Sequence, residues 1–257
     1  MIIKTDIKEK FSNLIKEQNL NFFDDPFVVK NFLKNVEDYL NWNTLNEAIN
    51  NDIVNWRLIE EEDKAFAGGK EHFEVPWNVP FWAGIRQQDK QFILDYVNNG
   101  STFQICGCCI LNDNLKSLVS DIQEAFTGAC DIRIYGSKNG DTKAFPPHAD
   151  RPFTFIIQAD GDTDWIVFKN RISNMLLHEY YEPKREELIP ALEVTLSPGD
   201  LLYIPPRAYH CALPSMPRLS MSIPCISFDS FYYLQNYVPD FYQIVNRLAT
   251  DTNKYEF

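Results

Sequence analysis

Residues 145–158 read FPPHADRPFTFIIQ, and the interpretation of the rest of the chain starts from this stretch. His148 and Asp150 are two residues apart, so on an extended backbone both side chains project to the same side. An imidazole nitrogen and a carboxylate oxygen in that arrangement can hold one metal ion. The apolar run that begins at Phe153 is typical of a strand.

A second histidine stands in a comparable setting. Residues 197–210 read SPGDLLYIPPRAYH and end at His210, one of four histidines in the chain. Two histidines and one carboxylate make the facial triad of non-haem Fe(II) oxygenases, which leaves coordination positions open. A lone His-x-Asp arises by chance in many proteins, and a histidine hydrogen-bonded on a strand surface explains either residue alone. Both segments together predict that His148, Asp150 and His210 bind a metal.

The pattern of apolar stretches and turns along the chain predicts a mainly β fold with flanking helices. From Asp131 onward short apolar stretches alternate with turns, and this pattern is typical of a sandwich or barrel such as a jelly roll. Expected strands are residues 25–33, 103–111, 131–135, 153–158, 164–169, 193–196, 201–204 and 219–223. Apolar residues at helical spacing predict helices near residues 7–15, after a capping box at Thr44–Glu47, and over 115–126.

We expect one jelly-roll domain with a helical decoration at its N-terminus over residues 1–226, followed by a helical tail at 227–257. The tail carries an apolar stripe that includes Phe231, Leu234 and Val238. Leaving such a stripe in water costs roughly 1.5–3 kcal/mol per large side chain. The stripe therefore packs either on a second subunit, which would make a homodimer, or on its own jelly roll.

The amino-acid composition of the chain limits the kinds of molecule that it is expected to bind. The chain has a net charge of −12 and a pI of about 4.8, and no cluster of Lys and Arg forms a stripe, so nucleic-acid binding is not expected. An acidic surface would instead attract a basic partner. The N-terminus is too charged for a signal peptide and no apolar run approaches a membrane span, which predicts a cytoplasmic protein.

The remaining metal-ligating residues are interpreted as structural. Cys106, Cys108 and Cys109 lack the two-residue gap of a zinc knuckle and lie in an apolar stretch, so small thiols in a core are the favoured reading. His72 and His178 lie in polar segments without a paired carboxylate motif. We interpret both as surface residues.

A wider set of motifs carries a family resemblance. It comprises Pro147-His-Ala-Asp150, Gln158 and Gly161, Trp165, and the PGDLLYIP of residues 198–205 ahead of His210. With these motifs the sequence resembles the JmjC-like cupin oxygenases, in particular the ribosomal-oxygenase and factor-inhibiting asparaginyl hydroxylase branch, from about Phe27 to Ile223. The resemblance implies a double-stranded β-helix, Fe(II), 2-oxoglutarate and O2, and hydroxylation of a polypeptide or amino-acid side chain.

Two departures from the family pattern matter. Members commonly place Lys or Arg two residues after the hairpin glycine, where it binds the distal carboxylate of 2-oxoglutarate, but this chain has Thr163 there. The larger ribosomal oxygenases also carry a winged-helix domain, for which the residues after the β-rich part are too few. The resemblance therefore leaves the substrate open.

Four residues are candidates to bind 2-oxoglutarate in place of the missing cation. Thr163 offers a hydroxyl, and Lys169 lies further along the same strand. Arg218 and Ser220 share one face of the predicted strand, and Arg-x-Ser resembles the anchor of the wider oxygenase superfamily. The alternative is an edge strand with Arg218 in solvent. Beside the metal, Tyr203 or Tyr209 is expected to orient the imidazoles.

Three functions are compatible with these residues. The leading one is an Fe(II)- and 2-oxoglutarate-dependent hydroxylase. The absence of a basic residue at Thr163 keeps open a cupin metalloenzyme whose chemistry does not use 2-oxoglutarate. A non-catalytic cupin binding module is the third, against which the intact triad argues.

Overall fold

The computed structural model describes residues 7–17, 25–51, 54–59, 65–67, 90–126, 128–139, 144–150, 152–172 and 187–227. Its α-helices are α1 (Ile7–Glu17), α2 (Trp42–Ile49), α3 (Lys90–Asn98) and α4 (Asp113–Phe126). The strands before the His-x-Asp motif are β1 (Phe27–Val29), β2 (Asn55–Ile59), β3 (Ala65–Ala67), β4 (Thr102–Cys106), β5 (Gly128–Cys130) and β6 (Arg133–Ser137). Those from the motif onward are β7 (His148–Ala149), β8 (Phe153–Asp160), β9 (Thr163–Arg171), β10 (Pro190–Leu196), β11 (Leu201–Ile204), β12 (Ala208–Pro214) and β13 (Arg218–Ser227).

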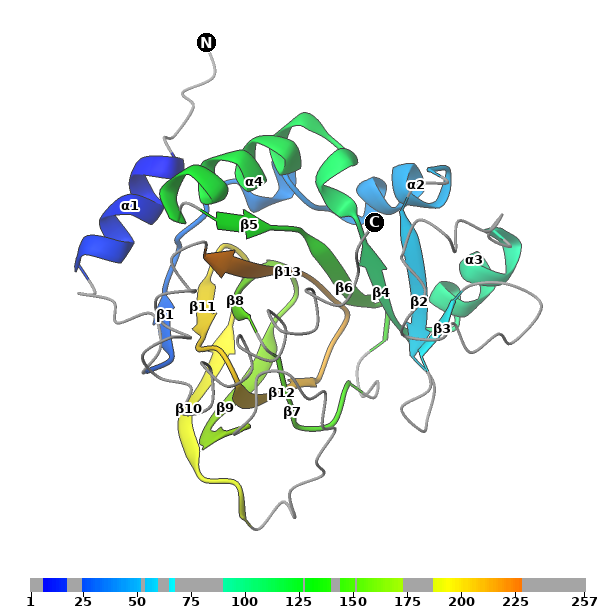
Figure 1. Ribbon diagram of the computed structural model, residues 1–257. Coiled ribbons are helices and arrows are strands. Elements are labelled where there is room, and N and C mark those ends of the chain that lie inside the picture. The colour runs from blue at the N-terminus through cyan, green and yellow to red at the C-terminus, as the bar shows by residue number, and fades with distance from the viewer. Residues whose placement is uncertain are drawn as a thin grey trace, which may run out of the picture.

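The described strands form two antiparallel sheets. The larger follows the order β1-β11-β8-β13-β6-β4-β2-β3, with β5 also paired to β13, and the smaller follows β10-β9-β12-β7. Helices α1, α4 and α2 cover one face of the larger sheet, and the smaller sheet lies on its other side (Figure 1). The predicted mainly β jelly roll with flanking helices is confirmed.

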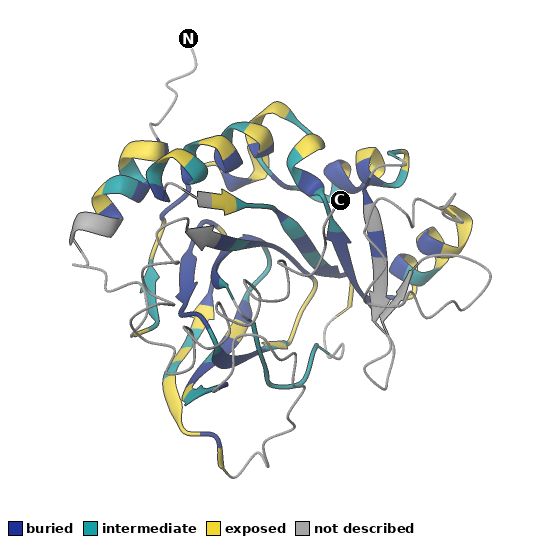
Figure 2. Ribbon diagram, viewed as in Figure 1, coloured by how far each residue is buried: buried dark blue, intermediate teal, exposed yellow. Residues whose placement is uncertain are grey.

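The main hydrophobic core lies between the helices and the larger sheet. Phe11 of α1 is fully buried and meets Phe155 of β8 edge-on, with ring centroids 5.2 Å apart. Leu118 and Ile122 of α4 belong to the same cluster. Figure 2 shows the buried side of these helices turned toward the sheet. Burial of each such side chain stabilises the fold by roughly 1.5–3 kcal/mol.

The two faces of β8 serve two different cores. Phe155 and Ile157 pack under the helices, whereas Ile156 packs between the sheets with Trp165 and Leu202. Because successive side chains of a strand alternate, a strand buried on both faces reads as a continuous apolar run. The inner face of the larger sheet is therefore the floor of a space between the sheets, and this space is where the functional side chains lie.

Three local predictions differ from the structure. The second helix begins at Trp42 with Asn41 as its N-cap, so Thr44 is the third helical residue and bonds back to the Asn41 backbone. The predicted strand over 25–33 is only the three residues of β1. The cysteine stretch forms β4 and then turns at Gly107, and Cys108 is a buried core thiol as expected.

The hairpin between β8 and β9 depends on a glycine. Gly161 has a φ of 64°, and a Cβ atom there would lie 2.0 Å from the Pro217 carbonyl oxygen. Only glycine combines that left-handed conformation with such a close approach. The tight turn brings the start of β9 directly beside the end of β8, next to the loop that leads into β13.

Asp200 clamps the turn before β11 onto the segment that follows β1. The residue is 3% exposed. Its Oδ2 atom accepts hydrogen bonds from Lys30 Nζ at 2.7 Å and from the Ser197 amide at 2.8 Å. Its Oδ1 atom accepts one from the Asn31 amide at 2.9 Å. Burial alone would raise the pKa of Asp200, but the hydrogen bonds from Lys30 and the two amides lower it below its usual value. A carboxylate with three donors is a strong structural tie.

We expect Asp200→Asn to lower the free energy of unfolding by about 1–3 kcal/mol, because an amide loses the charge-assisted bonds and places an NH2 group among donors. Because the pKa of Asp200 is lowered in the folded protein, its stabilising contribution is fully present above the ordinary carboxyl pKa. That contribution is lost as the pH falls through the pKa of Asp200 in the folded state. Urea unfolding at pH 7 and at pH 3 measures this difference. Glu193→Gln, on an exposed position of β10, is the control. An equal loss at both pH values would contradict the prediction.

Parts of the sequence prediction lie outside the described residues. These are the helical tail with its apolar stripe, of which nothing beyond Ser227 is described, and both His72 and His178. The homodimer through the tail therefore stays a prediction. Within the described residues, no helix is both long enough and apolar enough to cross a membrane.

Candidate metal centre

Two neighbouring strands of the smaller sheet position the three predicted ligands. His148 of β7 and His210 of β12 are directly opposite each other in the antiparallel register, so their side chains project from the same face. Asp150 comes directly after β7, two residues beyond His148, and returns to that face. The backbone ladder therefore brings together residues that are about sixty positions apart in the sequence.

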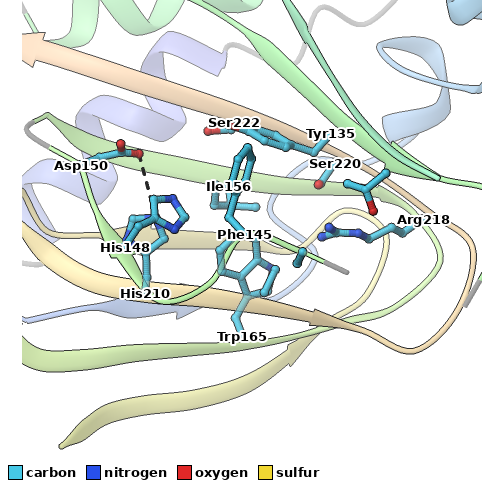
Figure 3. Close-up of a pocket in the computed structure, with 13 residues that line it drawn as sticks. Tyr135, Phe145, His148, Asp150, Ile156, Trp165, His210, Arg218, Ser220 and Ser222 are labelled. Atoms are coloured by element: carbon cyan, nitrogen blue, oxygen red, sulfur yellow. Dashed lines mark ion pairs between the residues drawn. The ribbon is translucent and has the colours of Figure 1, made fainter. Parts of the chain in front are cut away.

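The three side chains converge closely enough to share one ion. One ligand atom from each side chain lies within 4.8 Å of the other two. Among the described residues, no other group of three or more His, Cys, Asp or Glu side chains is close enough to hold a metal ion. The imidazole centroids are 4.4 Å apart, and His210 Nε2 lies 3.9 Å from Asp150 Oδ2. Figure 3 shows Asp150 pointing toward the histidines across the dashed ion pair.

Backbone carbonyls orient both imidazoles. His148 Nδ1 lies 2.9 Å from the Pro146 carbonyl oxygen, and His210 Nδ1 lies 2.9 Å from that of Ala208. A carbonyl oxygen only accepts, so each Nδ1 carries the proton and each Nε2 keeps its lone pair for a metal. The expectation that a tyrosine orients the imidazoles is wrong. Tyr203 stacks on Phe27 in the helix-side core, and Tyr209 packs with Phe168 on the other face of β12.

Burial keeps His210 in the form that binds metal. Its side chain is nearly inaccessible, and burial, with the neighbouring His148, lowers the pKa of His210 to about 4. Asp150 acts in the opposite direction and only partly offsets this. His210 is therefore neutral at pH 7, and a metal ion does not have to displace a proton from it.

The triad forms one end of a pocket between the two sheets. Phe145, Ile156 and Trp165 make its apolar walls. Arg218, Ser220 and Ser222 of β13 line it from the larger sheet, and in Figure 3 Arg218 lies at the end away from the histidines. The pocket is thus polar at both ends and apolar between, a shape suited to a short ligand with two polar ends.

Arg218 is the buried cation of this pocket. Its side chain is 2% exposed, and within the described residues its Nε has no hydrogen-bond partner. Burial lowers the pKa of Arg218 to about 10, with Tyr135 acting against this, so the guanidinium is still charged at pH 7. A buried cation with an unused donor needs an anion. The prediction that Arg218 and Ser220 share an inward face is confirmed in its geometry.

The structure does not bring the other two anchor candidates to this pocket. Thr163 is fully buried, and its hydroxyl accepts a hydrogen bond from Gln158 Nε2 at 3.1 Å. Lys169 is exposed, although strand parity placed it with Thr163. It lies six residues beyond Thr163, near the far end of β9, and it does not line the pocket.

Sequence reasoning missed the contribution of β4 and β6. Tyr135 of β6 lines the pocket, and Gln104 of β4 donates to its hydroxyl at 2.7 Å. Burial raises the pKa of Tyr135, so its hydroxyl keeps its proton. The alternation of residues 131–135 indicated the strand, but the sequence did not show that this strand pairs with β13 beside the metal centre.

Comparison with known proteins shows which family this site is similar to. The family model described as the JmjC domain matches residues 112–231, the span from the start of α4 through β13. This stretch is similar to JmjC domains. Ribosomal oxygenase 1 of Gallus gallus is 26% identical over 174 residues, covering 63% of this chain and 29% of that protein. A bifunctional lysine-specific demethylase and histidyl-hydroxylase NO66 of Dictyostelium discoideum is 31% identical over 121 residues, covering 46% and 23%.

Solved structures support the fold of this JmjC-like domain. The ribosomal oxygenase YcfD of Escherichia coli, in complex with cobalt and 2-oxoglutarate, superimposes with a TM-score of 0.60 at 19% identity. The match covers 87% of this chain and 54% of that one. A YcfD complex with cobalt and succinic acid gives a TM-score of 0.57 at 18% identity, over 84% and 51%. The chain spans less than a third of the two curated relatives named above.

Proposed function

We propose that this JmjC-like domain is an Fe(II)- and 2-oxoglutarate-dependent oxygenase that hydroxylates a polypeptide or amino-acid side chain. The observation that carries the proposal is the pocket itself, with His148, Asp150 and His210 at one end and the buried guanidinium of Arg218 at the other. Two imidazoles and a carboxylate suit Fe(II) and leave open positions. YcfD, which has this fold, was solved with cobalt and 2-oxoglutarate.

The residues of this chain have distinct roles in the proposal. His148, Asp150 and His210 hold the ion, and the carbonyls of Pro146 and Ala208 keep the imidazoles in the binding tautomer. When bound, Fe(II) with 2-oxoglutarate supplies the oxidising chemistry: 2-oxoglutarate, O2 and a substrate C–H group give succinate, CO2 and a hydroxylated product.

Arg218 and Tyr135 hold the distal carboxylate of 2-oxoglutarate in the proposal. The Tyr135 oxygen already accepts from Gln104, and burial keeps the hydroxyl protonated, so its own proton is available to an acceptor in the pocket. The unpartnered Arg218 Nε supplies the charge. The cation thus reaches the pocket from β13 instead of from the Thr163 position on β9, and Ser220 adds a hydroxyl beside it.

The relatives support a polypeptide substrate, because their names describe ribosomal oxygenases and a histidyl-hydroxylase. The net charge of −12 favours a basic partner protein at long range and argues against nucleic acid. A cytoplasmic location stays a prediction from the sequence.

Anaerobic titration with Fe(II) and 2-oxoglutarate tests the function. We expect a weak visible charge-transfer band only when both are present, because chelation through the 2-oxo acid group produces it. Succinate, which lacks the 2-oxo group, is the matched control. Admitting O2 should then convert 2-oxoglutarate to succinate.

Two outcomes of these measurements would each favour one of the other two functions. Fe(II) binding without 2-oxoglutarate binding in calorimetry would favour a cupin metalloenzyme of different chemistry. No Fe(II) binding at all would favour a non-catalytic binding module.

A further inference from the structure

A second arginine, Arg133, lies next to the metal end of the pocket and has no role in the proposed reaction. It begins β6 and is directly opposite Ser222 of β13, which lines the pocket. Arg133 is also two residues before Tyr135, another lining residue. Residues two apart on a strand, and residues directly opposite across an antiparallel pair, share a face. The side chain of Arg133 therefore leaves the sheet on the pocket side.

The contacts of Arg133 place its charge near the metal centre. Tyr135 and Asp150 lie close enough to Arg133 for their charges to raise its pKa. Burial alone would lower the pKa of Arg133, but Tyr135, Cys106 and Asp150 raise it above its usual value, so the group is permanently charged. The ion pairs among the described residues do not include Arg133. A half-buried cation that forms no ion pair with any described carboxylate, and that feels Asp150 only as a neighbouring charge, favours an anionic ligand.

With Fe(II) and 2-oxoglutarate bound, the positive charges at the site outnumber the negative charges by one. Under the proposed function the positive groups are a divalent iron, Arg133 and Arg218, and the negative groups are Asp150 and the two carboxylates of 2-oxoglutarate. Four positive charges therefore face three negative ones. The metal and Arg218 take both carboxylates of 2-oxoglutarate, so Arg133 is the cation that remains for the substrate.

We propose that Arg133 determines substrate specificity by receiving a carboxylate of the substrate beside the metal centre, so that the reacting residue is acidic and a cationic one is rejected. This inference rests on the proposed function. At the separations found inside one pocket, opposite or like charges change binding by about tenfold or more. The net charge of −12 acts at long range on the partner as a whole, whereas Arg133 acts on the side chain that enters the pocket.

Small probes that stand for side chains test the inference on the full chain. The protein is loaded with Fe(II) and saturating 2-oxoglutarate without O2, and acetate, acetamide and methylguanidinium are titrated at constant ionic strength. They represent a carboxylate, a carboxamide and a guanidinium side chain. Their dissociation constants are read from the change in the charge-transfer band. We expect acetate to bind at least about tenfold more tightly than acetamide, and methylguanidinium to bind most weakly.

Variants at Arg133 separate its charge from a structural role. Arg133→Gln should lose the preference for acetate, and Arg133→Lys, which keeps a point charge, should recover part of it. Lys169→Gln removes an exposed cation from β9 of the smaller sheet and should leave the order of the three affinities unchanged. A wild-type protein without preference for acetate, or a preference that persists in Arg133→Gln, overturns the inference.

The charge-transfer band is recorded first without probes. Its absence contradicts the proposed function and removes this inference with it, whereas its presence without acetate preference contradicts the inference alone.

Discussion

Asp150→Ala, His148→Ala and His210→Ala should each weaken Fe(II) binding by more than about 100-fold in anaerobic calorimetry. Partners that only orient a ligand cost about 10–100-fold when removed, and loss of a ligand itself exceeds that. All three positions line the pocket and none belongs to the helix-side core, so the fold should persist in the variants. His210 is 3% exposed and is the most buried of the three, so its replacement is the one that most affects packing.

Circular dichroism and thermal melting of the same samples separate loss of metal from loss of fold. Asp95→Ala, an exposed carboxylate of α3, is the control and should bind Fe(II) as the wild type does. Full Fe(II) affinity in any one triad variant would remove that residue from the ligand set.

Arg218→Met should reduce 2-oxoglutarate affinity by roughly 30-fold or more while leaving Fe(II) affinity nearly unchanged. Truncating one partner of a buried charge pair costs about 2–5 kcal/mol, and every 1.4 kcal/mol is tenfold in affinity. Arg218→Ala should act in the same direction, and Ser220→Ala should be milder because it removes a neutral hydroxyl.

The same substitution should stabilise the protein in the absence of 2-oxoglutarate. Burial lowers the pKa of Arg218 to about 10, which means that folding works against its charge throughout the neutral range. Methionine is apolar, of similar length, and has no such cost. Thermal melting should therefore show a higher midpoint for Arg218→Met alone and little further rise on adding 2-oxoglutarate. Lys169→Ala is the control, and unchanged 2-oxoglutarate affinity in Arg218→Met would exclude the residue as the anchor.

The sequence predicted those parts of the site that depend on strand alternation alone. The two-residue spacing of His148 and Asp150, and of Arg218 and Ser220, sets their faces without knowledge of any partner strand. Lys169 shows the limit of that reasoning, because a shared strand parity with Thr163 does not bring its exposed side chain to the pocket.

Pairing between distant strands was the part that the sequence could not provide. Tyr135 reaches the pocket, with Arg133 and Gln104 beside it, only because β13 pairs with β6 and β6 pairs with β4. Tyr203 was assigned to the wrong side for a related reason. It belongs to an apolar stretch in which both faces of β11 are buried, so hydrophobicity did not show which face is inner.

The direct pairing of His148 with His210 has a consequence for how the site acquires its metal. The separation of the two imidazoles follows from a backbone ladder that is part of the smaller sheet. We therefore expect loading not to be a folding step, in contrast to small domains that fold around zinc. A preformed site of this kind follows the general affinity order of divalent metals, in which cobalt, nickel, copper and zinc all exceed Fe(II). Which ion occupies the protein in a cell is therefore decided by the supply of free metal, and any purified sample should be assayed for its metal content before its activity is judged.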